Sequence, residues 1–208
     1  MAMAKGKTVK TAPRRKQAAE SGVVAPAAPP ASDTRGKLIA AAAQEFNQHG
    51  FDGTDSNKIA RRAGFAPQTF YRWFRDKTEI FIAVYRAWED EERRVSNELL
   101  TAKAGPRRLF EAAVAHHRDY LRFRRSLRKL ALEDAEVRQA RAASRLRQIA
   151  QIRRWIGPKA RPAPEIAAVL LQIERLCDAL AEGEFADMGL DEEKGYAAVI
   201  ALKDQLSR

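Results

Sequence analysis

Helical periodicity constrains the fold of this chain more than any other feature. From Ser32 onward, apolar side chains recur every three or four residues, and Gly and Pro separate the runs. No segment convincingly alternates apolar and polar residues as a half-buried strand does. The pattern therefore predicts an all-α fold of about nine helices, in which a three-helix unit precedes a larger helical domain.

Residues 1–32 differ in composition from the rest of the chain. Six Lys and Arg residues stand against Glu20 alone (six minus one, +5), and Ala and Pro dominate the remainder. Because this segment has so few large apolar side chains, their burial cannot offset the conformational entropy lost on folding. We therefore predict a disordered basic arm. Such an arm either follows DNA phosphates or a groove, or is a solubilising tail or start-site extension.

Charge and cysteine usage narrow the class of protein. The formal net charge of +11 over 208 residues favours a polyanionic partner. The alternative is that the charge comes from a GC-rich genome, which encodes many Arg and Ala residues. Cys177 is the single cysteine, which excludes an internal disulfide and fits a reducing cytosol. Neither a membrane-spanning run nor the apolar core of a signal peptide is present. We predict a cytoplasmic protein with no membrane partner.

Two short helices around a glycine turn form the most informative stretch, residues 50–77. The first helix begins after Thr54 or Asp55, Gly64 makes the turn, and Pro67 suits the first position of the second helix. The second helix is short, aromatic and basic. A helix-turn-helix unit requires this pattern, because small residues brace the first helix against a second helix that enters the major groove.

This stretch resembles the DNA-binding domain of TetR-family regulators. The resemblance implies a helix-turn-helix domain over residues 33–77, followed by an effector-binding and dimerisation domain over residues 78–208. The residues that carry it are Gly50, Phe51, Thr54, Ile59, Ala60, Ala63, Gly64, Thr69, Tyr71, Phe74, Lys77, Ile80 and Phe81.

The resemblance also implies DNA contacts. Phosphates would be bound by Thr69, Tyr71 and Lys77, with Trp73 at a position that often does the same. Base edges would be read from the exposed face of the second helix and the start of the first. The candidate readers are Asn57, Pro67, Gln68 and Arg72, and Thr54 and Ser56 complete the predicted DNA-binding set.

The second helix departs from the family pattern at its start. Ala66 stands where Ser usually caps the helix, a loss of about 1 kcal/mol that Pro67 partly offsets. Three aromatic residues of this helix-turn-helix are expected in its core, namely Phe65, Phe70 and Phe74.

The domain over residues 78–208 is expected to dimerise. One helix-turn-helix offers too few contacts for tight specificity, whereas two recognition helices about 34–36 Å apart read a palindrome. The last apolar helices suit an intersubunit four-helix bundle, with an ordinary buried core as the alternative. The predicted interface residues are Ile166, Leu170, Ile173, Leu176, Cys177, Leu180, Tyr196, Val199 and Leu206.

A small-molecule effector, not identified by the sequence, is expected in the same domain. Aromatic residues and one histidine could form its pocket, and plain core packing is the alternative. His116 and His117 point about 100° apart on a helix, so we predict no metal site, and no cofactor is expected. The candidate pocket residues are Tyr85, Trp88, Phe110, His117, Tyr120 and Phe123.

Charge is distributed unevenly along the chain. Residues 107–161 hold sixteen basic residues against five acids (+11), and residues 162–208 hold four against ten (−6). Three interpretations remain open for the arginines, which include Arg122, Arg125 and Arg128. They line a pocket for an acidic effector, add contacts to DNA phosphates, or lie in solvent with acidic partners one turn away.

These features together predict a homodimeric, sequence-specific regulator of double-stranded operator DNA. Repression released by an effector is the expected outcome, because a dimer that covers a promoter blocks polymerase. The alternative is a sequence-tolerant, DNA-coating nucleoid protein. No paired carboxylates with a base, Ser-His-Asp grouping, P-loop or Gly-rich dinucleotide turn is present, so an enzyme is not expected.

Overall fold

The computed structural model describes residues 31–206, with side chains from Thr34 onward, and this part of the chain is helical without strands. The all-α prediction is confirmed. No helix within the described range is long and apolar enough to cross a bilayer. The helices are α1 (Ala31–His49), α2 (Ser56–Arg62), α3 (Pro67–Tyr71), α4 (Lys77–Thr101), α5 (Pro106–Asp119), α6 (Leu121–Glu133), α7 (Ala135–Ile156), α8 (Ala163–Glu182), α9 (Glu184–Asp187) and α10 (Glu192–Gln205), with a 3₁₀ turn at Gly157–Lys159.

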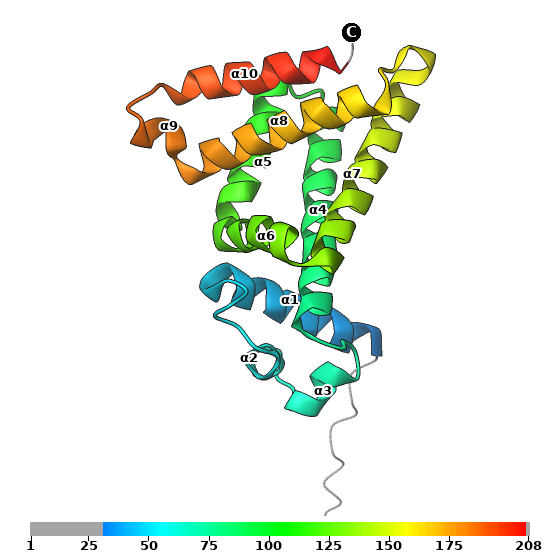
Figure 1. Cartoon of the computed structure of the whole chain (residues 1–208), viewed down its shortest axis with the longest axis vertical. Helices are drawn as coiled ribbons and strands as arrows, with labels where there is room; N and C mark the ends of the chain where they lie inside the picture. Colours follow the sequence, from blue (N-terminus) through cyan, green and yellow to red (C-terminus); the bar gives the residue numbers. More distant parts are fainter. Residues whose placement is uncertain (1–30, 207–208) are drawn as a thin grey trace, which may run out of the picture.

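The helices form a small unit at one end and a larger one above it (Figure 1). Helices α1 to α3 make the small unit, and the 25-residue α4 runs from it to the far end, about 37 Å at 1.5 Å per residue. Helices α8 and α10 pack side by side across that far end, and α5, α6 and α7 fill the space between. This arrangement places α3 and the α8–α10 pair at opposite ends of the subunit.

Local signals set the boundaries of the small unit. Gly50 ends α1 with φ of +71° and donates its N–H to the Phe46 carbonyl at 2.9 Å, and Gly64 makes the α2–α3 turn with φ of +79°. At the start of α4, an Asp76 carboxylate oxygen accepts from the Glu79 N–H at 2.9 Å. The Glu79 side chain in turn accepts from the Arg75 N–H at 2.6 Å, so the two acids satisfy backbone donors on both sides of the helix start.

The main core joins the small unit to the helices above it. Phe81 of α4 lies between Phe46 of α1 and Phe123 of α6, with ring centroids 5.0 and 4.9 Å away. All three rings are completely buried, and each contributes on the order of 1.5–3 kcal/mol through burial. The predicted boundary between residues 77 and 78 falls at the start of α4, and this core continues across it.

A second, smaller core holds α8 and α10 against α5. Its buried residues include Val114, Cys177 and Val199. Gly195 lets α10 approach α8 closely, because a Cβ added there would lie 2.8 Å from the Leu180 side chain.

The apolar residues from Leu109 to Leu127 lie in two helices, because the chain breaks at Tyr120, with φ of −117° and ψ of 31°. Helix α3 ends at Tyr71. The described range holds ten α-helices and not about nine, because α9 is a single turn and too short to show periodicity. Residues 1–30 of the predicted arm lie outside the described residues, and α1 begins at Ala31, inside the predicted arm.

Candidate nucleic-acid interface

The α2–α3 unit is a helix-turn-helix, as predicted. A carboxylate oxygen of Asp55 caps α2 by accepting from the Lys58 N–H at 2.8 Å. Helix α3 has no side-chain cap at Ala66 and begins with Pro67, as expected. Phe70 is completely buried between the helices, and so α3 presents its opposite side outward.

The outward side of α3 and the start of α2 carry polar groups available to a partner. Asn57, Pro67, Gln68 and Arg72 are exposed, so the structure places all four predicted base readers on the surface. The polar side chains among them make no hydrogen bond to the rest of the described chain. They therefore combine the amide and guanidinium donors and acceptors that recognise base edges.

Tyr71 links the two helices. Its side chain is 59% exposed, and its hydroxyl lies 2.8 Å from the Ser56 hydroxyl on α2. This hydrogen bond holds the phenol at the edge of the surface. The neighbouring Thr69 and Trp73 are half-buried, and Trp73 packs against the main core.

Lys77 and Thr54 have internal partners. The Lys77 ammonium donates to the Phe51 carbonyl at 2.8 Å and to the Thr54 carbonyl at 2.9 Å, and lies 4.0 Å from the centroid of the Phe51 ring. Burial lowers the pKa of Lys77. These two bonds leave one of its three N–H donors for a phosphate. Thr54 is buried and donates to the Glu45 carbonyl at 3.3 Å, so its side chain braces the α1–α2 loop and does not reach the surface.

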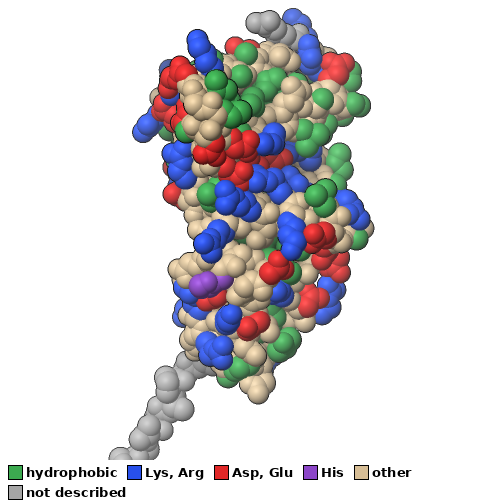
Figure 2. Space-filling view, turned by 60° about the vertical axis from the view of Figure 1, so that its left-hand side comes forward, with side chains coloured by type: hydrophobic (Ala, Val, Ile, Leu, Met, Phe, Trp, Pro, Cys, Tyr) green, Lys and Arg blue, Asp and Glu red, His purple; other side chains and the backbone are tan. Residues whose placement is uncertain are grey.

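The arginines of α6 are paired mainly with acids that lie far away in the sequence. Arg125 and Arg128 both bond to Glu182 of α8, and Arg122 donates to the Gln48 carbonyl of α1 at 2.8 Å. Figure 2 shows acidic side chains facing basic ones across the middle of the molecule. The α6 arginines therefore differ from the third interpretation, because their acidic partners come from another helix. Pairs one turn apart do occur elsewhere in this segment, as between Arg107 and Glu111.

A buried ion network continues this pairing inward. The His117 imidazole lies between Asp178, 2.9 Å from Nδ1, and Glu92, 3.4 Å from Nε2. Burial alone would lower the pKa of His117, but the two carboxylates raise it above its ordinary value. Arg124, only 2% exposed, donates to Asp178 at 2.9 Å from its Nη2. The network connects α4, α5, α6 and α8.

The six predicted pocket residues belong to this filled interior. Tyr85, Trp88, His117 and Phe123 are buried, and Phe110 and Tyr120 are half-buried against the two cores. In this structure the six side chains pack in the protein interior, which is the alternative to an effector pocket that the sequence left open.

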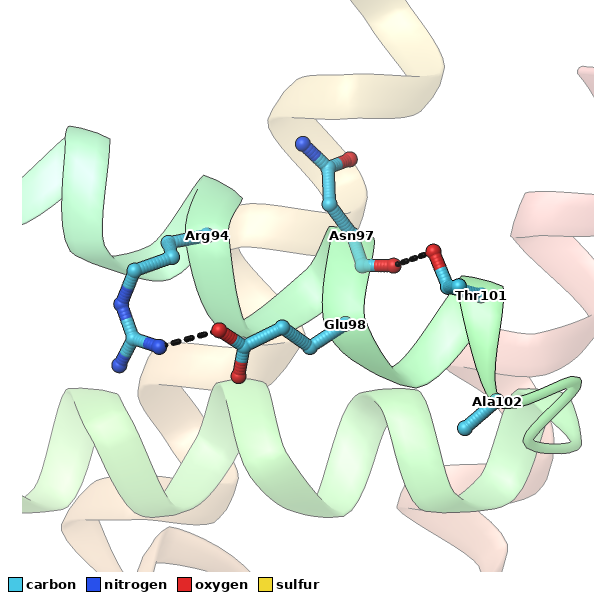
Figure 3. Close-up of a pocket in the computed structure, with 5 residues that line it drawn as sticks. All are labelled: Arg94, Asn97, Glu98, Thr101 and Ala102. Atoms are coloured by element: carbon cyan, nitrogen blue, oxygen red, sulfur yellow. Dashed lines mark hydrogen bonds and ion pairs between the residues drawn. The ribbon is translucent and has the colours of Figure 1, made fainter.

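Two hollows of the described chain lie elsewhere and are open to solvent. The first follows one face of α4 (Figure 3), where Arg94 pairs with Glu98 and the Thr101 hydroxyl donates to the Asn97 carbonyl at 2.8 Å. Its polar groups bond to one another along a single helix and do not converge on a ligand. The second lies between α8 and α10 and includes Leu171 and Leu202.

The predicted dimer residues divide into two groups. Five are buried within the subunit, namely Ile166, Cys177, Leu180, Tyr196 and Val199. The other four are half-buried, namely Leu170, Ile173, Leu176 and Leu206. The sequence analysis did not single out the exposed Leu171, or Leu202 in the same hollow. Periodicity identifies an apolar stripe but not which side of it is exposed.

Comparisons of sequence identify similar proteins. The family model described as bacterial regulatory proteins, tetR family, matches residues 38–84. The uncharacterized HTH-type transcriptional regulator YdgC of Bacillus subtilis is 32% identical over 68 residues, 33% of this chain and 35% of the relative. The HTH-type transcriptional activator FasR of Mycolicibacterium smegmatis is 25% identical over 118 residues, 57% of this chain and 54% of the relative. The chain thus spans about a third and about half of these two curated relatives.

Solved structures share the fold over most of the chain. One assigned to a TetR-family transcriptional regulator from a Rhodococcus species has a TM-score of 0.65 at 18% identity, covering 85% of this chain and 100% of that chain. One assigned to a transcriptional regulator from Pseudomonas aeruginosa has a TM-score of 0.60 at 19% identity, covering 85% and 91%. At this identity the likeness concerns the fold, which extends beyond the helix-turn-helix into the second domain.

Proposed function

We propose that this chain, whose residues 38–84 match the tetR family model, is a TetR-family regulator and acts as a homodimeric, cytoplasmic repressor of palindromic operator DNA that an effector releases. The observation that carries the proposal is the outward side of α3. Gln68 and Arg72 are exposed there without internal hydrogen-bond partners in the described chain, and Tyr71 stands beside them.

In the proposed complex, α3 lies in the major groove. Gln68 and Arg72 hydrogen-bond to base edges, and Pro67 contacts a thymine methyl group. Thr69, Tyr71 and the remaining N–H of Lys77 bind phosphates on either side, which fixes the register without reading sequence.

The proposed dimer is formed by α8 and α10 of two subunits. Leu171, Leu176 and Leu202 line the open hollow between these helices, and apolar residues of this kind are buried when a four-helix bundle forms. A two-fold axis at this end leaves both α3 helices free at the other end, where a palindrome with half-sites about 34–36 Å apart would bind them.

The first experiment is genome-wide occupancy of the tagged protein, followed by a titration on the best site with nonspecific competitor DNA. We expect a few sharp peaks that share a palindrome. An operator overlapping a promoter supports repression, whereas an operator upstream of it indicates activation, the activity named for the Mycolicibacterium relative.

The matched variants are Tyr71→Ala and Trp155→Ala. Both remove an exposed aromatic side chain, but Trp155, 76% exposed, lies at the end of α7, far from α3. We expect Tyr71→Ala to abolish operator binding and leave the dimer intact, while Trp155→Ala binds normally. Normal operator binding by Tyr71→Ala would refute the assignment of α3 as the recognition helix.

The second candidate is a DNA-coating protein, which the net charge of +11 favours. It would bind all DNA equally, with a steep dependence on salt. The ion pairs between α6 and α8 weigh against it, because they neutralise arginines that would otherwise offer a basic surface. Broad occupancy without a motif would support this candidate over the repressor.

A further inference from the structure

Three arginines converge on one carboxylate between α6, α7 and α8. Glu174 of α8 accepts from Arg124 Nη2 at 3.0 Å and from Arg141 Nη2 at 2.9 Å, both on the same oxygen. Its other oxygen accepts from Arg145 Nη2. Arg141 and Arg145 are one turn apart on α7, so their guanidinium groups reach the same point. Burial would raise the pKa of Glu174, but the three arginines outweigh it and lower that pKa.

The cluster has more positive charge and more donors than its own carboxylate satisfies. Arg124 also bonds to Asp178, but Glu174 is the only carboxylate partner of Arg141 and of Arg145 among the described residues. Each guanidinium has five N–H donors, and the hydrogen bonds of Arg141 use one of them. If Glu174 turned away, two guanidinium groups would lose their counter-charge.

The cluster is also reachable from solvent. The side chains of Arg141, Arg145 and Glu174 are 25%, 21% and 16% exposed, whereas Arg124 beneath them is buried. In Figure 1, α8 crosses the upper part of the molecule above α6, and α7 runs from α6 up to the end of α8. A ligand could therefore replace the Glu174 carboxylate without opening either core.

A second observation concerns Trp88, which contacts Arg124 of the cluster. The Arg124 guanidinium carbon lies 4.6 Å from the centroid of the Trp88 ring. The Trp88 Nε1–H is buried and has no acceptor within the described part of the chain. A buried N–H without a partner is costly, so an oxygen acceptor that reached this N–H would be stabilised.

We propose that Arg124, Arg141 and Arg145 form a binding site for a small di- or tricarboxylate, whose carboxylate groups replace that of Glu174. Two ligand carboxylates would pair with the guanidinium groups of Arg141 and Arg145, which lose Glu174 as their partner. Planar guanidinium groups bind carboxylates in bidentate fashion. The proposal thereby specifies the chemical class of the effector. Binding of the ligand does not depend on the proposed function, but its effect on operator DNA does.

The site is connected to the DNA-binding unit through α6 and α7. Lys129 of α6 pairs with Asp52 at 2.7 Å, and Glu136 of α7 pairs with Arg75 at 2.8 Å, just before α4. When a ligand displaces Glu174, the ion pairs through which Glu174 joins α8 to α6 and α7 are lost. The positions of α6 and α7 relative to α1 and α4 can then change, which is the consequence expected for operator release.

The test uses succinate and citrate as probes on the full chain without DNA, with sodium chloride and sodium sulfate at matched ionic strength as controls. We expect saturable binding by calorimetry and a rise in the melting temperature with either carboxylate. The double variant Arg141→Gln/Arg145→Gln should lose this binding while its circular dichroism retains the helical signal.

Glu174→Ala distinguishes a ligand site from a purely structural cluster. The variant removes the competing internal carboxylate, so it should bind the same probe about tenfold more tightly than the wild-type chain. The proposal is overturned if neither probe binds the wild-type chain saturably, if sulfate binds equally well, if the double variant retains binding, or if Glu174→Ala binds more weakly.

Operator release is measured separately. Succinate or citrate should lower operator affinity in the wild-type chain and not in the double variant. Failure of the wild-type chain to bind an operator without any probe would refute the proposed function and leave the binding result standing.

Discussion

Asp178 is the acid on which the buried ion network depends, and we predict that Asp178→Asn strongly destabilises the chain. The side chain is 3% exposed, and one oxygen accepts from Arg124 Nη2 and from His117 Nδ1, both at 2.9 Å. The other oxygen lies 2.9 Å from Arg128 Nη1. Burial would raise the pKa of Asp178, but His117 and Arg124 hold it well below its ordinary value, so the carboxylate is charged at neutral pH.

The size of the effect follows from what remains after the substitution. Asparagine keeps the volume but removes the charge, and its amide N–H₂ faces a cation wherever the side chain turns. Removing one partner of a buried ion pair costs about 3–5 kcal/mol, because the other charge stays buried without compensation. Arg124 keeps its bond to Glu174, so we expect a loss of about 3 kcal/mol, the lower end of that range.

The assay is urea unfolding at pH 7, followed by circular dichroism at one fixed protein concentration, because association contributes to the stability of a dimer. With an m-value of about 1–3 kcal/mol/M, the midpoint should fall by roughly 1–3 M. Glu193→Gln is the control, because it removes an exposed pair with Arg107 and should leave the midpoint almost unchanged. A loss below about 1 kcal/mol for Asp178→Asn would refute the reasoning, since it would place Arg124 in a well-solvated site.

Three further predictions test other parts of the second domain. Burial raises the pKa of the Cys177 thiol to about 12, so a disulfide reagent at pH 8 should label it only after unfolding; labelling of the folded chain would contradict its burial. Burial alone would lower the pKa of His117, but Asp178 and Glu92 raise it above 6.5, so its stabilisation is complete below pH 6.5 and is lost as pH rises through the raised value. His117→Asn should therefore lose more free energy of unfolding at pH 6 than at pH 8.5, and an equal loss at both would exclude titration of the imidazole between these two pH values. Gly195→Ala should cost about 1–3 kcal/mol in thermal or urea unfolding, because the new Cβ meets Leu180, whereas the control Gly36→Ala, with open space around it, should be neutral or stabilising.

The sequence by itself determined the features that depend on near neighbours. Gly50 and Gly64 end helices because they adopt positive φ without strain, and Asp55 and Asp76 cap the next helix through an N–H three residues away. The helix-turn-helix and the exposure of the four candidate base readers followed from these signals together with the apolar spacing. Such interactions act within one turn, and therefore they can be read from a single stretch of chain.

The tertiary structure alone decided the partners of the charged residues. The excess of arginine in residues 107–161 was visible in the sequence, but the pairing of Arg128 with Glu182 and of Arg141 with Glu174 was not. Lys77 likewise has internal acceptors more than twenty residues away. Charge attracts without regard to sequence distance, so only the packing of α6, α7 and α8 determines which guanidinium meets which carboxylate. The same packing decides that Cys177 faces the core while Leu171 is exposed. The apolar stripe of α8 is wide enough that part of it lies in the core and part on the surface.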